Sequence, residues 1–298
     1  MYCTPRFLGA CCARKSIALP RLGRSRCSYH PFATLAAPVV PNLVAHKISD
    51  SHQRHHIRAV HHHLQSQGIL KISLGFSDEK SQYLENLVMG LGAYHGHGPP
   101  ITHSASRGWF WDVRPGKNTC LPQNDRARSE TMQEFPWHTD CSYEDSPPQY
   151  FALQVLRPDR CGGGTLSVLK VDQLTRFLSS SAKAALCEPE FQIKIPPEFI
   201  KQPNERHIMG SILGINEQDQ STIMRFREDI GNICLEALKR VLEDSELSSK
   251  ATLHLKAADL PERSIILLDN RRWLHARNSV KDPSRHLRRV RWNAVPFS

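Results

Sequence analysis

Long apolar runs are missing from this sequence of 298 residues, because charged residues or prolines interrupt every hydrophobic segment. A helix that spans a membrane needs roughly 18 or more consecutive apolar residues, so we expect no membrane span. Internal repeats are also missing. A chain of this length can bury most of the surface that its unfolded form exposes, in one large domain or two small ones.

Acidic residues are missing from the first 49 positions, and the first acid is Asp50. This segment carries +7 of the formal net charge of +10, through Arg6, Arg14, Lys15, Arg21, Arg24, Arg26 and Lys47. Such an Arg-rich, Ser-containing composition is typical of a mitochondrial transit peptide, and a disordered basic extension shares it. We therefore expect a basic leader over 1–49 and a single domain over 50–298. If the leader is a transit peptide, the protein is expected in mitochondria, and otherwise in the cytoplasm.

The nine cysteines lack the CxxC spacing of a metal site or redox motif. Four lie in the leader, and the other five are scattered (Cys120, Cys141, Cys161, Cys187 and Cys234). An odd, scattered set fits a reducing compartment and predicts no disulfide framework.

Helical periodicity is present near the start of the body, residues 50–298. Apolar residues spaced three and four apart predict a helix over 52–68, followed by a strand over 69–74. A second helix is expected over 78–91, with Ser77 as its N-cap. The first helix carries a cluster that is more typical of a solvated face than of a metal site (His52, His55, His56, His61, His62 and His63).

From about residue 101 the pattern changes to short β-type runs separated by Gly, Pro and Asn. Strands are expected over 109–113, 150–156, 165–169, 191–195, 211–215, 222–226, 251–255, 264–268 and 289–294, and helices over 173–180 and 228–242. Many short strands with few helices predict a mainly β protein with flanking helices. We expect its core to be a jelly roll, a double-stranded β-helix of the cupin kind.

A candidate metal site begins in the segment 135–140, which ends in His138-Thr139-Asp140. Residues i and i+2 at a strand end point to the same face, so His138 and Asp140 can bind one ion. A third candidate, His275, follows the expected strand 264–268. Two histidines and one carboxylate that leave other positions open are typical of non-haem iron(II). Catalytic zinc uses the same ligands.

Four motifs in this order resemble one family. The chain is similar to the taurine dioxygenase and clavaminate synthase-like branch of the 2-oxoglutarate oxygenases. It matches WHxD over 137–140, GGxTL over 162–166, DNRRxxHGR over 269–277 with Ala276 in place of Gly, and RxLxR over 285–289.

The resemblance implies Fe(II) held by His138, Asp140 and His275, with 2-oxoglutarate and O₂ as cosubstrates. It places the Thr165 hydroxyl and Arg285 on the distal carboxylate of 2-oxoglutarate. A planar guanidinium can bind a carboxylate through two parallel hydrogen bonds. Arg289 shares strand parity with Arg285, and we assign it to the C1 end of 2-oxoglutarate or to a substrate carboxylate.

The implied reaction oxidises a C–H bond by hydroxylation, desaturation or ring closure, and releases succinate and CO₂. Because the carboxylate of Asp140 is present, halogenation is not expected. The resemblance favours a small carboxylate or amino-acid-like substrate, of the kind found in secondary metabolism, with Arg225 and Arg289 as candidate contacts.

Two alternatives stay open. One is a zinc hydrolase that uses the same three ligands. The other is a basic nucleic-acid-binding protein, although the body holds all 29 acids and no recognised nucleic-acid module. We therefore expect no nucleic-acid partner. Three further arginines are expected on a solvated basic face (Arg277, Arg288 and Arg291).

Overall fold

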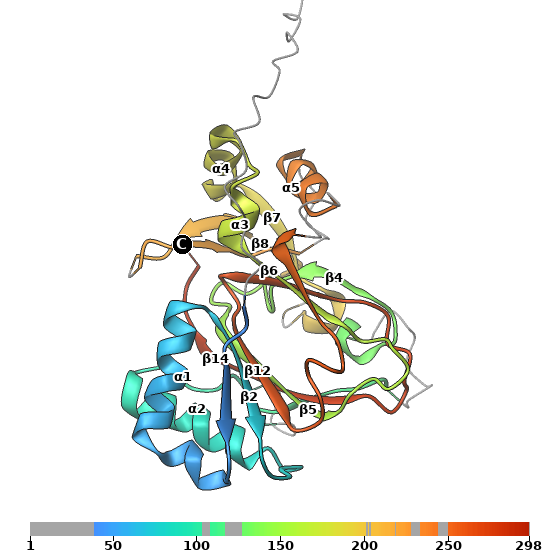
Figure 1. Cartoon of the computed structure of the whole chain (residues 1–298). Helices are drawn as coiled ribbons and strands as arrows, with labels where there is room; N and C mark the ends of the chain where they lie inside the picture. The colour runs from blue at the N-terminus through green and yellow to red at the C-terminus, as the bar shows by residue number, and fades with distance from the viewer. Residues whose placement is uncertain are drawn as a thin grey trace, which may run out of the picture. The chain divides into compact units, whose positions relative to one another are not determined.

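The structure is a computed structural model that describes residues 39–102, 108–116, 127–200, 202, 204–217, 219–227, 233–243 and 250–297 (Figure 1). Two β-sheets form its centre. The six-stranded sheet has the order β1 (Asn42–Ala45), β2 (Ile69–Leu74), β12 (Ser264–Asp269), β5 (Pro148–Arg157), β14 (His286–Ala294), β3 (Trp111–Val113). The four-stranded sheet has the order β11 (Thr252–Leu255), β6 (Leu166–Lys170), β13 (Trp273–Arg277), β4 (Phe135–His138). The predicted mainly β, jelly-roll fold is confirmed.

Alternation along the strands separates the apolar layers. On β5, Phe151, Leu153 and Val155 pack in the layer between the two sheets. Their neighbours Tyr150 and Ala152 pack on the opposite face of the same sheet. Since side chains on a strand alternate in direction, one sequence of apolar residues supplies both layers.

Two helices, α1 (Arg54–Ser66) and α2 (Gln82–His95), cover the outer face of the six-stranded sheet (Figure 1). The sequence places the start of α2 too early. Ser77 is not its N-cap, because Asp78 accepts hydrogen bonds from the backbone of Gln82 and Tyr83 at 2.9 Å each. The turn from Asp78 to Ser81 is tight, with φ of 59° at Ser81, so the helix begins only after it.

The outer face of the four-stranded sheet carries a second apolar cluster. Its elements are α3 (Val171–Thr175), α4 (Ser180–Cys187), α5 (Ile233–Glu243), β7 (Phe191–Lys194), β8 (His207–Gly210), β9 (Leu213–Ile215) and β10 (Thr222–Met224). The single helix expected over 173–180 is two short helices. Ser179 interrupts it because its side chain accepts a hydrogen bond from Ala182 N and caps α4.

The N-terminal side of the domain differs from the expected boundary at residue 50. Residues 1–38 lie outside the described residues, so the transit peptide stays a prediction. However, β1 pairs in parallel with β2, and a 3-10 helix spans Ile48–His52. The folded part therefore includes residues that the sequence assigned to the leader.

Within the described residues, no helix has the length and apolar character that a membrane crossing requires. The predicted solvated histidine face is wrong for one member of α1. His56 is buried, and its Nε2 lies 2.5 Å from the Tyr83 hydroxyl oxygen.

Candidate metal and cosubstrate site

The three predicted ligands come together between the sheets. β4 and β13 are antiparallel neighbours, and their register places His138 opposite His275. Asp140 follows β4, and its Oδ1 lies 3.8 Å from His138 Nε2 and 3.7 Å from His275 Nε2. The ligand atoms of the three side chains all lie within 4.8 Å of one another, and all three residues are buried. Among the described residues, no other group of three potential ligands has this geometry.

A backbone contact sets the proton position on His138. Its Nδ1 lies 2.8 Å from Pro136 O, and because a carbonyl can only accept, Nδ1 carries the proton. Nε2 therefore presents its lone pair toward Asp140. Burial, followed by the neighbouring His275, lowers the pKa of His138 well below its usual value. A neutral imidazole with a free Nε2 is the form that binds metals.

The Asp140 carboxylate is paired across the layer with Arg289 on β14. Arg289 Nη1 lies 3.2 Å from Oδ1 and 3.1 Å from Oδ2. Burial raises the pKa of Asp140, but the positive charge of Arg289 opposes it most strongly, and the pKa lies well below the usual value. Asp140 is therefore an ionised carboxylate in a buried position.

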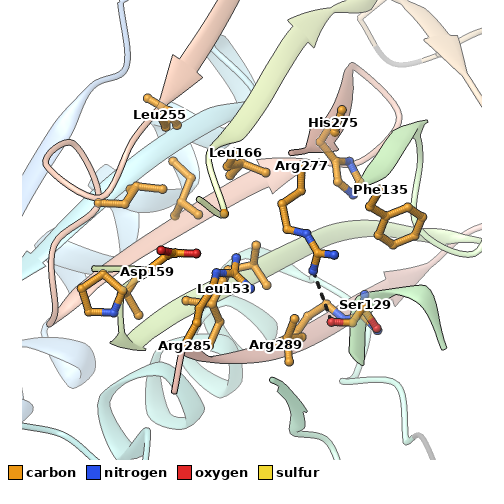
Figure 2. A pocket seen from close by; sticks show the side chains of 18 of the residues that line it. Ser129, Phe135, Leu153, Asp159, Leu166, Leu255, His275, Arg277, Arg285 and Arg289 are labelled. Atoms are coloured by element: carbon orange, nitrogen blue, oxygen red, sulfur yellow. Dashed lines mark hydrogen bonds between the residues drawn. The ribbon is translucent and has the colours of Figure 1, made fainter. Parts of the chain in front are cut away.

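A cavity extends from these ligands between the two sheets (Figure 2). Its volume is about 80 Å³, well above the roughly 10–15 Å³ that a cavity needs to hold one water. Its walls include apolar side chains such as Leu153, Leu166 and Leu255. Figure 2 shows His275 on one side of the cavity and Arg285 on the other. The cavity suits a molecule of a few carbon atoms.

Arg285 lines this cavity and is only 5% exposed. Among the described residues, its Nη1 has no hydrogen-bond partner. Burial, followed by the nearby charge of Arg277, lowers its pKa to about 10, so the group remains a cation at neutral pH. A buried cation with an unused donor is costly unless an anion pairs with it.

Asp159 positions the loop that carries Arg285, a role that the sequence analysis missed. This residue lies after β5, and its carboxylate accepts hydrogen bonds of 2.7–3.2 Å from four backbone N–H groups. Two belong to its own loop and two to the loop before β14 (Cys161, Gly163, Lys281 and Asp282). No local pattern indicates the role, because half of these partners are over 120 residues away.

Gly164 explains part of the glycine run in the GGxTL match. Its φ is +64°, and a Cβ built there would lie 2.8 Å from Arg285 Nε and 3.2 Å from Asp159 Cβ. Glycine therefore allows both the left-handed backbone and the close approach of the guanidinium.

Two predicted residues are not brought to the cavity. Gly164 and Leu166 line it, but Thr165 between them does not, and Thr165 N donates to Asn278 Oδ1. Arg225 does not line it either. Its Nε donates to Ser211 O, and its Nη1 to Glu144 O.

The solvated face expected for three arginines is wrong for two of them. Arg277 and Arg291 are 7% and 6% exposed, because β13 and β14 point them into the layer between the sheets. Arg277 lines the cavity and donates to the carbonyls of a preceding loop (Ser129, Thr131 and Gln133). Arg288, with the opposite parity on β14, is half-buried and pairs with Asp112.

These residues fit the predicted metal and cosubstrate. His138, Asp140 and His275 supply two imidazoles and one carboxylate whose ligand atoms lie close enough to bind one ion, as non-haem iron(II) requires. The unpaired Nη1 of Arg285 faces the same cavity and fits the carboxylate of a small dianion.

No family model and no curated protein matches this sequence. Solved structures do match. An asparagine oxygenase in complex with Fe(II), (2S,3S)-3-hydroxyasparagine and succinate superposes with a TM-score of 0.61, at 17% identity over 79% of this chain and 78% of that one. The non-haem iron oxygenase OrfP with Fe and α-ketoglutaric acid gives 0.60, at 16% identity over 87% and 95%.

A putative α-ketoglutarate-dependent taurine dioxygenase from Burkholderia xenovorans gives a TM-score of 0.62, at 13% identity over 88% of this chain and 90% of that one. At such identities the likeness concerns the fold. The chain has the fold of the taurine dioxygenase-like oxygenases, as its sequence motifs predicted.

Proposed function

We propose that this chain is an Fe(II)- and 2-oxoglutarate-dependent oxygenase. The observation that carries the proposal is the buried group of His138, Asp140 and His275 at the end of a cavity that Arg285 also lines, with an Nη1 that has no hydrogen-bond partner among the described residues. Neighbours of the same fold were crystallised with Fe(II) and with α-ketoglutaric acid.

In this proposal, His138 and His275 bind the metal through Nε2, and Asp140 supplies the anionic ligand. Arg285 binds the distal carboxylate of 2-oxoglutarate. Thr165 was expected to share this carboxylate, but it does not line the cavity, so the assignment rests on Arg285. When bound, the iron and 2-oxoglutarate would activate O₂ to oxidise a C–H bond, with succinate and CO₂ as co-products.

The protein's contribution is orientation and a largely apolar lining. The cavity walls include Leu153, Leu166 and Leu255, and electrostatic interactions are stronger beside such low-polarity walls than in water. Arg289 keeps Asp140 ionised in this environment. His138 as a neutral imidazole and Asp140 as a carboxylate are therefore in the forms that bind a metal.

For the substrate, we propose a small amino-acid-like or carboxylate compound and hydroxylation as the reaction. The support comes from neighbours that hold 3-hydroxyasparagine and (3S)-hydroxy-L-Arg. Arg289 is the candidate contact for a substrate carboxylate, because it lies beside Asp140. Arg225 is not proposed for this role, since it holds backbone carbonyls away from the cavity.

The test is anaerobic addition of Fe(II) and 2-oxoglutarate to the full chain. We expect a weak visible charge-transfer band in the wild type and in His207→Ala, which changes an exposed histidine on β8, and no band in His138→Ala. A normal band in His138→Ala would refute the ligand assignment. A screen of amino acids for stimulated succinate release then identifies the substrate, and a gain of one oxygen in the product indicates hydroxylation.

The same preparation tests the zinc alternative. Zinc in the isolated protein, together with a hydrolytic activity that is unchanged when oxygen is removed, would support a zinc hydrolase.

A further inference from the structure

A single buried side chain, Asn270, is bound to the backbone of the ligand Asp140 on both sides. Asn270 follows β12 in the turn toward β13 and is 1% exposed. Its Oδ1 accepts a hydrogen bond from Asp140 N at 2.7 Å. Its Nδ2 donates to Asp140 O at 2.9 Å. The peptide groups before and after the Asp140 Cα are therefore both fixed to one carboxamide.

Asn270 is itself anchored to the sheet. Its Nδ2 also donates to Pro148 O at 2.9 Å, and its backbone N donates to Gln149 O at 2.7 Å. Both acceptors lie at the start of β5, in the centre of the six-stranded sheet. The contacts thus transfer the rigidity of that sheet to the turn after β4.

We infer that Asn270 is a positioning residue for the metal ligand Asp140, an inference that rests on the proposed metal site. Asp140 is the one ligand of the three that lies beyond the end of its strand, so no strand pairing fixes its direction. Asn270 takes the place of that pairing: it supplies the acceptor and the donor that a neighbouring strand would offer to the Asp140 peptide groups.

The chemistry of this position requires a carboxamide. Asn270→Asp keeps an acceptor for Asp140 N, but it loses both donors and turns carboxylate oxygens toward the carbonyls of Asp140 and Pro148. Asn270→Ala leaves all three backbone groups without this partner. Changes to residues that orient metal ligands typically weaken metal binding about 10–100-fold.

The experiment is an anaerobic titration of the metal-free full chain with Co(II), followed by its visible absorption. We expect both Asn270 variants to bind Co(II) about 10–100-fold more weakly than the wild type, with an altered absorption spectrum. This readout depends on neither 2-oxoglutarate nor turnover.

Asn293→Ala is the matched control. Asn293 on β14 also joins separate segments, because its Oδ1 accepts from Gly98 N at 2.6 Å and its Nδ2 donates to Gln149 at 2.7 Å. It contacts none of the three ligands. We expect this variant to melt at a lower temperature and to bind Co(II) within about twofold of the wild type.

The outcomes are distinct. If wild type and His138→Ala bind Co(II) equally, the proposed metal site is wrong. If His138→Ala loses binding while both Asn270 variants retain wild-type affinity, the positioning role is wrong. If Asn293→Ala loses Co(II) affinity as strongly as Asn270→Ala, general destabilisation explains the loss, and the positioning role is again refuted.

Discussion

Replacing His97 by Gln should remove part of the loss of stability that the protein undergoes in mild acid. Trp292 Nε1 lies 3.1 Å from His97 Nδ1, and because an indole N–H only donates, Nδ1 must accept. A neutral His97 then carries its proton on Nε2, which lies 3.0 Å from His61 Nδ1. Protonation of His97 would break this chain of hydrogen bonds.

The magnitude follows from the pKa of His97. Burial, followed by His61 and His95, lowers this pKa from 6.5 to about 4. Between these values the unfolded state binds a proton that the folded state does not, so stability rises with pH. The contribution is complete above pH 6.5 and is lost as the pH falls toward 4. At about 1.4 kcal/mol for each pH unit, the loss reaches about 3 kcal/mol at most.

The assay is urea unfolding of wild type and His97→Gln at several pH values from 7.5 to 4, at constant ionic strength. Other groups titrate in this window, so the quantity that matters is the difference between the two proteins. We expect this difference to change by about 2–3 kcal/mol across the window. A constant difference for His97→Gln would refute the reasoning.

Three further predictions concern the site and its support. Gly164→Ala should weaken 2-oxoglutarate binding about tenfold or more, a loss of about 1.4 kcal/mol, because its Cβ would meet Arg285. Gly162→Ala is the control, because Gly162 also has a positive φ but a Cβ built there would have no atom within 4 Å. Equal losses of 2-oxoglutarate affinity for the two variants in calorimetric titrations would contradict the steric argument. Arg272→Leu should lower the free energy of unfolding by about 2–3 kcal/mol, because the carbonyls at the end of α1 lose a charged donor. A change in this free energy below about 0.5 kcal/mol, measured by urea unfolding, would refute the prediction. Mn(II) at about 100 times its Kd should stabilise the metal-free protein by about 2.7 kcal/mol, and an unchanged calorimetric melting temperature would count against the site.

The grouping of His138, Asp140 and His275 could be predicted from the sequence because the chemistry of these residues is local. His138 and Asp140 have strand parity, and His275 follows a strand that reads clearly as buried. The register of β4 and β13 then brings the two histidines together. The same parity placed Arg289 on the inner face of β14, where the structure has it.

Residues that act through backbone groups of distant segments could not be predicted in this way. Asp159 and Asn270 bind peptide groups more than 120 residues away, and neither lies in a periodic pattern. Arg277 and Arg291 were assigned to a solvated surface because charge usually indicates exposure. Their burial follows from the tertiary position of β13 and β14, which the local sequence does not specify. Strand β1 was missed because its residues were assigned to the acid-free leader by composition.

The proposed metal ligands and the arginine that pairs with them come from opposite sheets, which has a consequence for the motions of the barrel. His138 and His275 belong to the four-stranded sheet, whereas Arg289 extends from the six-stranded sheet to Asp140. A metal and a dicarboxylate held between them would act as a cross-link through the apolar layer. Hydrogen exchange at the amides of β4 and β14 should then slow together when both are added, because the sheets could no longer separate independently.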